Sequence, residues 1–427
     1  MRRLVCLCLA GLFASIPVFA QLPSDTQQRI RDANGRIEKI RKGDVELFIS
    51  THDGEPIPYT DIHIEQIKSD FLFGCAAITV AKHSSEAAEA KYQQLFAKLF
   101  NFATILTYWP DTSPTPDTDK LDLLTAQVNA LRAKDITVKG HPLFLAGSAP
   151  LWAGQDPDLA RKKTLERIDK LTKLYAGKIT VWDVVGDSTT ATNAKNGLGA
   201  WARKSGAVKL TGDCMLEARK SKSGSTLLYN DYNLDEAYFN LIKGLKKDKA
   251  APDVLGLEAH MIGSEWDWNK LWSTADRFAS LNLPLHFSEI TVLSGDRQRP
   301  AKGGWVTTPA GEALQADYVE AMYTLLFSHP AVSGIAWWNF VDSDWDNIPS
   351  GFLRSDLSEK PVFGRLDHLI NTTWRTKVDL TTTPYGSAKF RGFSGKYRVT
   401  INSAFGFKTE VVDLVAGKHN QWNITVP

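Results

Sequence analysis

Short apolar runs alternate with longer stretches of helical rhythm between residues 71 and 370. In the longer stretches, for example 84–100 and 158–176, apolar residues recur at the three- and four-residue spacing of an amphipathic helix. The eight apolar runs cover residues 71–77, 101–106, 136–144, 179–186, 226–231, 254–260, 285–290 and 332–340. This alternation predicts a parallel sheet with right-handed crossovers, and eight units favour a closed barrel. We therefore predict an α/β fold, a (β/α)8 TIM barrel over residues 71–374.

The pattern changes before the barrel. Residues 27–42 have helical rhythm, and residues 45–49 and 62–67 each alternate apolar with polar positions. A turn-forming Asp-Gly pair lies between the two alternating segments. We therefore predict an N-terminal helix and a small β hairpin appendage within residues 21–70.

Alternation returns after the barrel. Past Trp374 it is seen in residues 397–401 and 409–414, which predicts a small C-terminal β-sandwich-like domain over 375–427. A tail of this size is barely large enough for its own core, so we expect it to dock on the barrel.

The first twenty residues have the pattern of a secretory signal peptide. Arg2 and Arg3 precede an apolar stretch that runs to Phe19, and Ala20 ends a small-residue cleavage site. No later stretch of ~18 uninterrupted apolar residues follows, so we expect no membrane association after cleavage of 1–20. The predicted location is secreted or periplasmic.

The composition narrows the possible partners. With 50 Lys and Arg against 48 Asp and Glu, the chain is nearly neutral, which argues against a nucleic-acid partner. The 13 Trp, 11 Tyr and 20 Phe supply flat apolar faces that can pack on sugar rings. After the signal only Cys75 and Cys214 remain, and we expect two buried free thiols. No metal or nucleotide motif is found, so we expect no cofactor and no bound metal, and we expect a monomer.

Two of the predicted strands end on a carboxylate, one on Asp187 and one on Glu289. An ionised group at the end of a buried strand is costly unless it is paired or used. Each could form a salt bridge or cap the next helix. Together they could instead supply the two carboxyl groups that glycoside hydrolysis needs, which makes them the candidate catalytic pair.

An ordered series of motifs accompanies these carboxylates. Trp182-Asp183-Val184-Val185 precedes Asp187, and further motifs occupy residues 100–104, 140–143, 230–233, 256–260, 288–289, 337–338 and 351–361. The series resembles glycoside hydrolase family 10, whose best-known members are retaining endo-β-1,4-xylanases. The resemblance covers the predicted barrel and implies a polysaccharide or oligosaccharide substrate.

The resemblance also implies roles for single residues. Glu289 corresponds to the nucleophile, Asp187 stands at the acid/base position, and His260 would orient Glu289 by a hydrogen bond. The residues that would bind substrate are His260, Glu258, Trp152, Trp337, Trp338 and Trp345.

The active site departs from the family pattern. Gly186-Asp187 stands where the family has Asn-Glu, Leu145-Ala146 where it has Trp-His, and Glu258 where it has Gln. Two hypotheses follow. In the first, the protein is a glycosidase that cleaves O-glycosyl bonds of a β-linked plant-type polysaccharide such as xylan. In the second, it is a catalytically impaired barrel that binds glycan without cleaving it.

Overall fold

Eight parallel strands form a closed barrel in the computed structural model, which describes residues 23–296 and 304–427. The strands are β3 (Leu72–Ala76), β4 (Phe102–Leu106), β5 (Thr137–His141), β7 (Val181–Gly186), β8 (Thr226–Asp231), β9 (Val254–Met261), β10 (Leu285–Val292) and β11 (Val332–Trp337). Each pairs with the next, the short β6 (Phe144–Leu145) extends the ladder beside β7, and the β11–β3 and β5–β7 pairings complete the ring. The predicted (β/α)8 barrel is confirmed.

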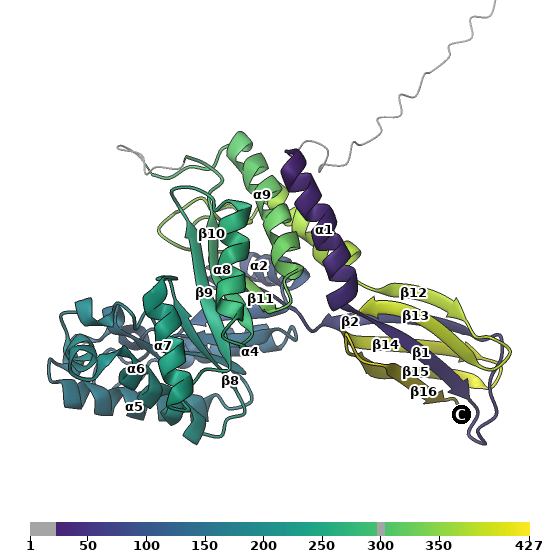
Figure 1. Ribbon diagram of the computed structural model, residues 1–427, viewed down its shortest axis with the longest axis horizontal. Helices are drawn as coiled ribbons and strands as arrows, with labels where there is room; N and C mark the ends of the chain where they lie inside the picture. Colours follow the sequence, from purple (N-terminus) through teal and green to yellow (C-terminus); the bar gives the residue numbers. More distant parts are fainter. Residues whose placement is uncertain (1–22, 297–303) are drawn as a thin grey trace, which may run out of the picture.

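Helices surround the barrel (Figure 1). They are α2 (Glu86–Leu99), α3 (Trp109–Thr112), α4 (Asp122–Arg132), α5 (Pro157–Leu174), α6 (Gly197–Lys220), α7 (Glu236–Lys247), α8 (Trp268–Ala279), α9 (Pro309–Phe327) and α10 (Pro361–His368). Several begin where the sequence supplies a cap, as at Ser85 and Asp156, whose side chains accept from a backbone N–H of the first turn. The N-terminal α1 (Ser24–Ile40) packs against α9.

The barrel core brings β5 and β7 very close together. A Cβ atom at Gly140 would lie 2.2 Å from the ring of Trp182, so only glycine fits there. Trp182 is itself fully buried. This close packing places His141, the next residue on β5, against Asp183 on β7.

The segments before and after the barrel form one two-sheet unit. In one sheet, β1 (Lys42–Ser50) pairs with β13 (Ser387–Phe393) and β16 (Asn420–Thr425). In the other, β2 (Asp61–Ser69) pairs with β12 (Lys377–Thr381) and β14 (Gly395–Ser403), and β15 (Gly406–Leu414) forms an edge. The predicted N-terminal hairpin is therefore wrong, because β1 and β2 belong to different sheets.

This sandwich has a core of its own. Leu47 and Ile64 from the N-terminal strands pack with Tyr397, Val399 and Trp422 from the C-terminal ones. The C-terminal strands alone are too few to enclose a core, and β1 and β2 supply the missing apolar faces. The sandwich therefore unites strands from before and after the barrel, and Figure 1 shows β1 beside the C-terminal strands.

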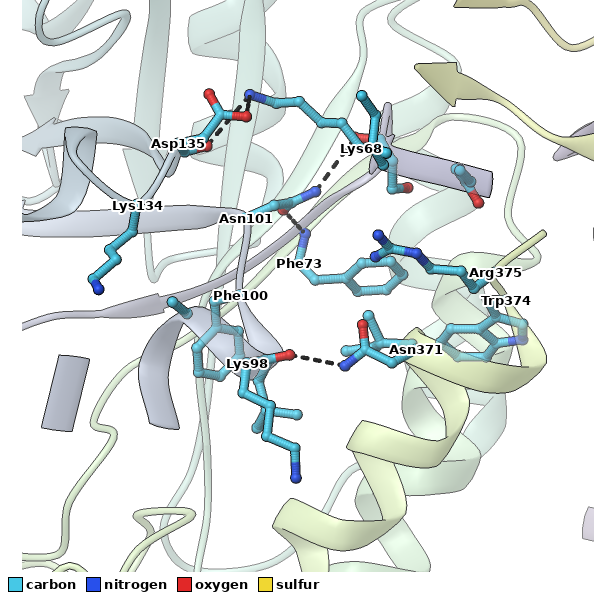
Figure 2. Close-up of a pocket in the computed structure, with 16 residues that line it drawn as sticks. Lys68, Phe73, Lys98, Phe100, Asn101, Lys134, Asp135, Asn371, Trp374 and Arg375 are labelled. Atoms are coloured by element: carbon cyan, nitrogen blue, oxygen red, sulfur yellow. Dashed lines mark hydrogen bonds and ion pairs between the residues drawn. The ribbon is translucent and has the colours of Figure 1, made fainter. Parts of the chain in front are cut away.

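The sandwich joins the barrel at the N-terminal ends of the strands (Figure 2). Asn101 donates from Nδ2 to the Phe71 carbonyl at 2.9 Å and accepts from the Phe73 N–H at 2.9 Å. Lys68 of β2 forms an ion pair with Asp135, which precedes β5, at 2.9 Å. A cavity of about 230 Å³ lies at this junction. It is at the opposite end of the barrel from the strand-end carboxylates.

Two further expectations concern the thiols and the N-terminus. Cys75 and Cys214 are both free and buried, as expected. The predicted signal peptide, 1–20, lies outside the described residues. Among those that are described, no helix combines the length and the apolar character needed to cross a bilayer.

Candidate active site

Glu289 lies on β10 near its C-terminal end and is 3% exposed. Its Oε1 accepts a hydrogen bond from Asn230 Nδ2 at 2.8 Å, and its Oε2 lies 3.2 Å from His260 Nε2. His141 Nδ1 lies 3.5 Å from Oε1. Nitrogen atoms from three strands thus surround one carboxylate.

The two histidines are held by further hydrogen bonds. His260 Nδ1 lies 2.8 Å from Thr291 Oγ1, which fixes the ring with its other nitrogen toward Glu289. His141 Nδ1 lies 2.6 Å from Asp183 Oδ2. A fixed imidazole positions the group it contacts, so the orienting contact expected of His260 is present in the structure.

These nitrogen atoms change the acidity of Glu289. Burial has the largest single effect and acts to raise the pKa, but His141, His260 and Lys139 outweigh it and lower the pKa below its usual value. Glu289 is therefore ionised at neutral pH.

Asp187 follows β7 in a left-handed backbone conformation, with φ of 54°. Its N–H donates to the Asn230 carbonyl at 3.0 Å. Burial, followed by the negative charges of Asp231 and Glu289, raises its pKa to about 7. Within the described part of the chain its buried Oδ1 has no hydrogen-bond partner, and neither it nor Glu289 is paired with Lys or Arg. An acid of this kind can hold a proton near neutral pH.

A pocket of about 360 Å³ opens beside Asp187. Leu145 and Ala146 line one side of it, at the position where the family pattern has Trp-His. Tyr232 lines it too, with 53% of the side chain exposed, and its hydroxyl lies 3.3 Å from Thr190 Oγ1. The pocket therefore offers apolar faces, hydroxyl groups and one carboxyl group.

Glu258 completes the cluster. Its Oε1 accepts from the same Asn230 Nδ2 at 2.6 Å, and its Oε2 lies 3.7 Å from His260 Nε2. Burial, then the charges of Glu289 and Asp187, raises the pKa of Glu258 well above its usual value. Glu258 is thus neutral beside an ionised Glu289.

Two of the four tryptophans predicted to line a cleft lie at this cluster. Trp338 meets His141 and His260 edge-on, with ring centroids 5.4 and 5.8 Å apart. The ring of half-buried Trp345 lies 5.1 Å from that of His260. These two indoles form one wall of the cluster.

The other two tryptophans lie elsewhere. Trp337 is fully buried, donates to the Ser350 carbonyl at 2.7 Å and packs on Phe352. The prediction that it lines the cleft is wrong, because it offers no surface to a ligand. Trp152 donates to the Ser113 carbonyl at 2.9 Å and meets Trp109 edge-on, and among the described contacts none joins it to Glu289.

Sequence reasoning missed Asp231 and Lys139. Asp231 accepts from Thr189 and raises the pKa of Asp187, and its place beside Asn230 in a matched motif was the available signal. Lys139 is fully buried in β5, and its Nζ has no hydrogen-bond partner among the described residues. The only sequence signal for Lys139 was the presence of a lysine within an apolar predicted strand.

The cluster also contains groups of the kind that bind metals. Donor atoms of Glu258, His260 and Glu289 lie within 4.8 Å of one another. Hydrogen bonds to Asn230 and Thr291 already engage them, and Glu258 is neutral. An ionised carboxylate and a protonated carboxyl group on neighbouring strands suit acid–base and nucleophilic chemistry better than cation binding.

Known proteins resemble this chain along most of its length. It is 26% identical over 390 residues to the anti-sigma-I factor RsgI6 of Acetivibrio thermocellus, and 24% identical over 425 residues to endo-1,4-beta-xylanase 1 of Arabidopsis thaliana. These matches cover 89% and 94% of this chain but 47% and 41% of those relatives. The chain thus spans about half the length of the curated relatives it matches.

Solved structures share the barrel. A family 10 structure from Paenibacillus barcinonensis matches with a TM-score of 0.60 and 18% identity, over 71% of this chain and 96% of that one. Xylanase 10B of Thermotoga petrophila, solved with xylobiose, matches with a TM-score of 0.58 and 19% identity, over 71% and 95%. At this identity the likeness shows the fold. The sequence model of glycosyl hydrolase family 10 matches residues 64–363, well over half of the chain. The chain therefore belongs to glycosyl hydrolase family 10.

Proposed function

We propose that this protein hydrolyses O-glycosyl bonds of a β-linked, xylan-type polysaccharide, with Glu289 as nucleophile and Asp187 as acid/base. The observation that carries the proposal is the contrast in protonation between the two groups. The pKa of Glu289 is lowered, so it is ionised, whereas that of Asp187 is raised to about 7, so it can donate a proton. Retaining glycosidases need one carboxylate and one carboxylic acid in these states.

In the first step, a Glu289 oxygen attacks the anomeric carbon and forms a glycosyl ester. The bond from that carbon to the leaving oxygen breaks, and Asp187 gives its proton to this oxygen. In the second step, Asp187 takes a proton from water, whose oxygen attacks the anomeric carbon and releases Glu289. His260 and Asn230 hold Glu289 in place through both steps.

The pocket beside Asp187 would receive the leaving sugar, because the acid must reach the leaving oxygen. The exposed ring of Tyr232 offers that sugar a flat apolar face. The indoles of Trp338 and Trp345 border the side of Glu289, where the retained sugar would lie.

Family membership and the xylanase names of several relatives support a xylan-type substrate. The near balance of 50 basic and 48 acidic residues is in keeping with an uncharged glycan.

One observation favours a second candidate, a barrel that binds glycan without cleaving it. Asp187 is one methylene shorter than the family's glutamate and is held at a positive φ with a buried oxygen. A shorter acid reaches the leaving oxygen less readily. In this alternative the cluster at Glu289 binds sugar hydroxyls only.

Release of reducing ends from xylan by the full chain separates the two candidates. Glu289→Gln should abolish release. Asp187→Ala should lower it by about 10²–10⁴-fold on xylan and far less on an aryl xyloside with a good leaving group, because that group needs no proton. Glu166→Gln, on the exposed face of α5, is the matched control. If the unaltered chain releases no reducing ends from xylan, arabinoxylan, mixed-linkage glucan or aryl glycosides, the second candidate holds.

We also propose that the protein acts outside the cytoplasm, in the periplasm or after secretion. Support comes from the charged and apolar pattern of residues 1–20. Fractionation of cells that express the full chain, with N-terminal sequencing of the product, should find a chain that begins at Gln21. A cytoplasmic chain with an intact N-terminus would contradict this.

A further inference from the structure

Exposed aromatic side chains are confined to two places in the described chain. Tyr232, at 53% exposure, lies at the candidate active site. The other four lie in the sandwich and are Tyr59 at 71%, Tyr385 at 80%, Phe405 at 57% and Phe407 at 65%. Aromatic side chains usually bury their rings, so four exposed rings in one small unit need a reason.

All four lie at the same end of the sandwich. In the four-stranded sheet, Asp61 at the start of β2 pairs with Thr381 at the end of β12 and with Asn402 near the end of β14. Tyr59 precedes β2, Tyr385 follows β12, and the other two lie in and just after the β14–β15 turn. Strand register thus brings together loops that are far apart in sequence. We call this end, residues 51–60, 382–386 and 403–408, the distal end.

The loops that carry Tyr59 and Tyr385 are hydrogen-bonded to each other. The Tyr59 N–H donates to the Thr382 carbonyl at 3.2 Å, and Thr382 Oγ1 accepts from the Thr60 N–H at 2.8 Å. The loop around Tyr385 also packs closely on β1, since a Cβ atom at Gly386 would lie 2.6 Å from the Ile49 carbonyl oxygen. The tyrosines are therefore presented on ordered backbone, which lowers the entropy cost of binding.

The distal end is remote from the candidate active site. The nine-residue β1 runs outward from the barrel, a length of ~30 Å at the usual rise per residue. Figure 1 shows the β1–β2 turn at the end of the sandwich that points away from the barrel. The sandwich also joins the barrel opposite the strand-end carboxylates, so these rings form no part of the catalytic cleft.

The charges at the distal end favour some classes of ligand over others. Asp53 and Glu55 lie there, with Lys408 as the cation, and Asp61 and Asp379 lie on the adjoining strands, where Asp379 contacts His63. A net acidic end disfavours an anionic lipid surface or a nucleic acid, both of which attract basic residues. Exposed tyrosine rings, with an apolar face and a hydroxyl group, suit a neutral ligand with flat apolar faces and many hydroxyl groups.

We propose that the distal end is a second glycan-binding site, at which Tyr59 and Tyr385 stack on rings of a neutral, insoluble β-linked polysaccharide. The site would hold the enzyme on insoluble material and so raise the concentration of chains near the cleft. This second site extends the proposed function, but its test measures binding alone.

The test is depletion of the full chain from solution by insoluble xylan and by microcrystalline cellulose. The chain should bind at least one of them. The Tyr59→Ala/Tyr385→Ala double variant should bind that polysaccharide about ten-fold or more weakly. Its hydrolysis of a soluble aryl xyloside should be unchanged. The matched control is Leu174→Ala/Leu314→Ala, which removes exposed apolar side chains from α5 and α9 and should bind normally.

Four results would overturn the proposal. These are failure of the unaltered chain to bind either polysaccharide, normal binding by the double variant, loss of all binding on Trp345→Ala alone, and a dimer in size-exclusion chromatography that the double variant abolishes. A chain that binds through the tyrosines but hydrolyses nothing would contradict the proposed function and leave this site standing.

Discussion

Glu258 and Glu289 accept hydrogen bonds from the same nitrogen, Asn230 Nδ2, at 2.6 and 2.8 Å. Two carboxylates this close cannot both be ionised without a large cost. Their surroundings give the two groups different pKa values. His141 and Lys139 lower the pKa of Glu289, whereas burial and the charge of Glu289 raise the pKa of Glu258. One proton therefore stays on Glu258, and Glu289 is left ionised, as the proposed nucleophile must be.

Replacing Glu258 with glutamine tests whether Glu258 is the protonated member of this pair. Glutamine keeps the size and neutrality of the protonated acid and can still accept from Asn230, so kcat/KM at pH 6 should change by less than about three-fold. Glu258→Ala should cost more, since it leaves a cavity and an unpaired amide hydrogen. Steady-state rates on an aryl xyloside measure both. A loss of 100-fold or more in Glu258→Gln would mean that Glu258 itself transfers protons or charge.

The pH profile of the enzyme should follow Asp187. Because its pKa is about 7, kcat/KM should fall above pH 7 as the acid loses its proton. The acid limb should lie below the usual glutamate range, because the pKa of Glu289 is lowered. The alkaline limb should be present on xylan and weak on an aryl glycoside with a good leaving group, and Asp187→Asn, assayed on that glycoside, should keep the acid limb and show no alkaline limb. An alkaline limb that persists in this variant would assign the acid to another group.

Asp187 should also make stability depend on pH. Its pKa is about 7 in the folded state and near 3.8 when unfolded, so the folded state binds more protons between these values. Stability from this group is therefore full below pH ~4 and is lost as pH rises toward 7. Asp187→Asn should raise the free energy of unfolding by ~1–2 kcal/mol at pH 8, after allowance for solvent screening. Thermal unfolding at pH 4 and pH 8 measures this, and an equal gain at both would indicate relief of backbone strain instead.

The junction between sandwich and barrel depends on Asn101. Its side chain donates to the Phe71 carbonyl and accepts from the Phe73 N–H in a partly buried setting. Asn101→Ala should lower the free energy of unfolding by ~2–3 kcal/mol, because two backbone groups lose their partner. Asn371→Ala, in the same region, removes a hydrogen bond to the Lys98 carbonyl that is exposed to solvent, and should cost ~1 kcal/mol or less. Denaturant unfolding compares them, and equal losses would contradict a special role for Asn101.

The barrel could be predicted because its signal is local. Each strand carries its own apolar run and each helix its own spacing, and eight repeats leave few topologies. The sandwich could not be predicted, because apolar and polar residues alternate along β1 in the same way whether it pairs with β2 or with β13. Its true partners, such as Phe390 opposite Val45, are more than 300 residues away. Alternation identifies a strand but not its neighbour.

The site was predictable only in part for a similar reason. Trp337 and Trp338 are adjacent in the motif, yet successive residues of a strand face opposite sides, and one lies in the core. The shared contact of Asn230 depends on register shifts between β9 and β10, beside Glu289, which no sequence pattern reveals. The type of chemistry followed from the strand-end carboxylates, whereas their protonation followed only from their neighbours.

Restoring the family pattern tests whether the Gly186-Asp187 pair limits catalysis. A Cβ atom at Gly186 would lie 3.4 Å from Leu145 Cδ1, an ordinary contact, and its φ is not positive. Asparagine therefore fits there after a small shift of Leu145. In Gly186→Asn/Asp187→Glu the longer acid reaches farther and the amide can bind a sugar hydroxyl, so kcat/KM on xylan should rise about ten-fold. Each single variant and Gly186→Ala are the controls. A loss of activity in the double variant would instead show that the cleft around Leu145 and Ala146 is built for the shorter acid, and would place the substrate's scissile bond closer to β7 than in relatives with glutamate.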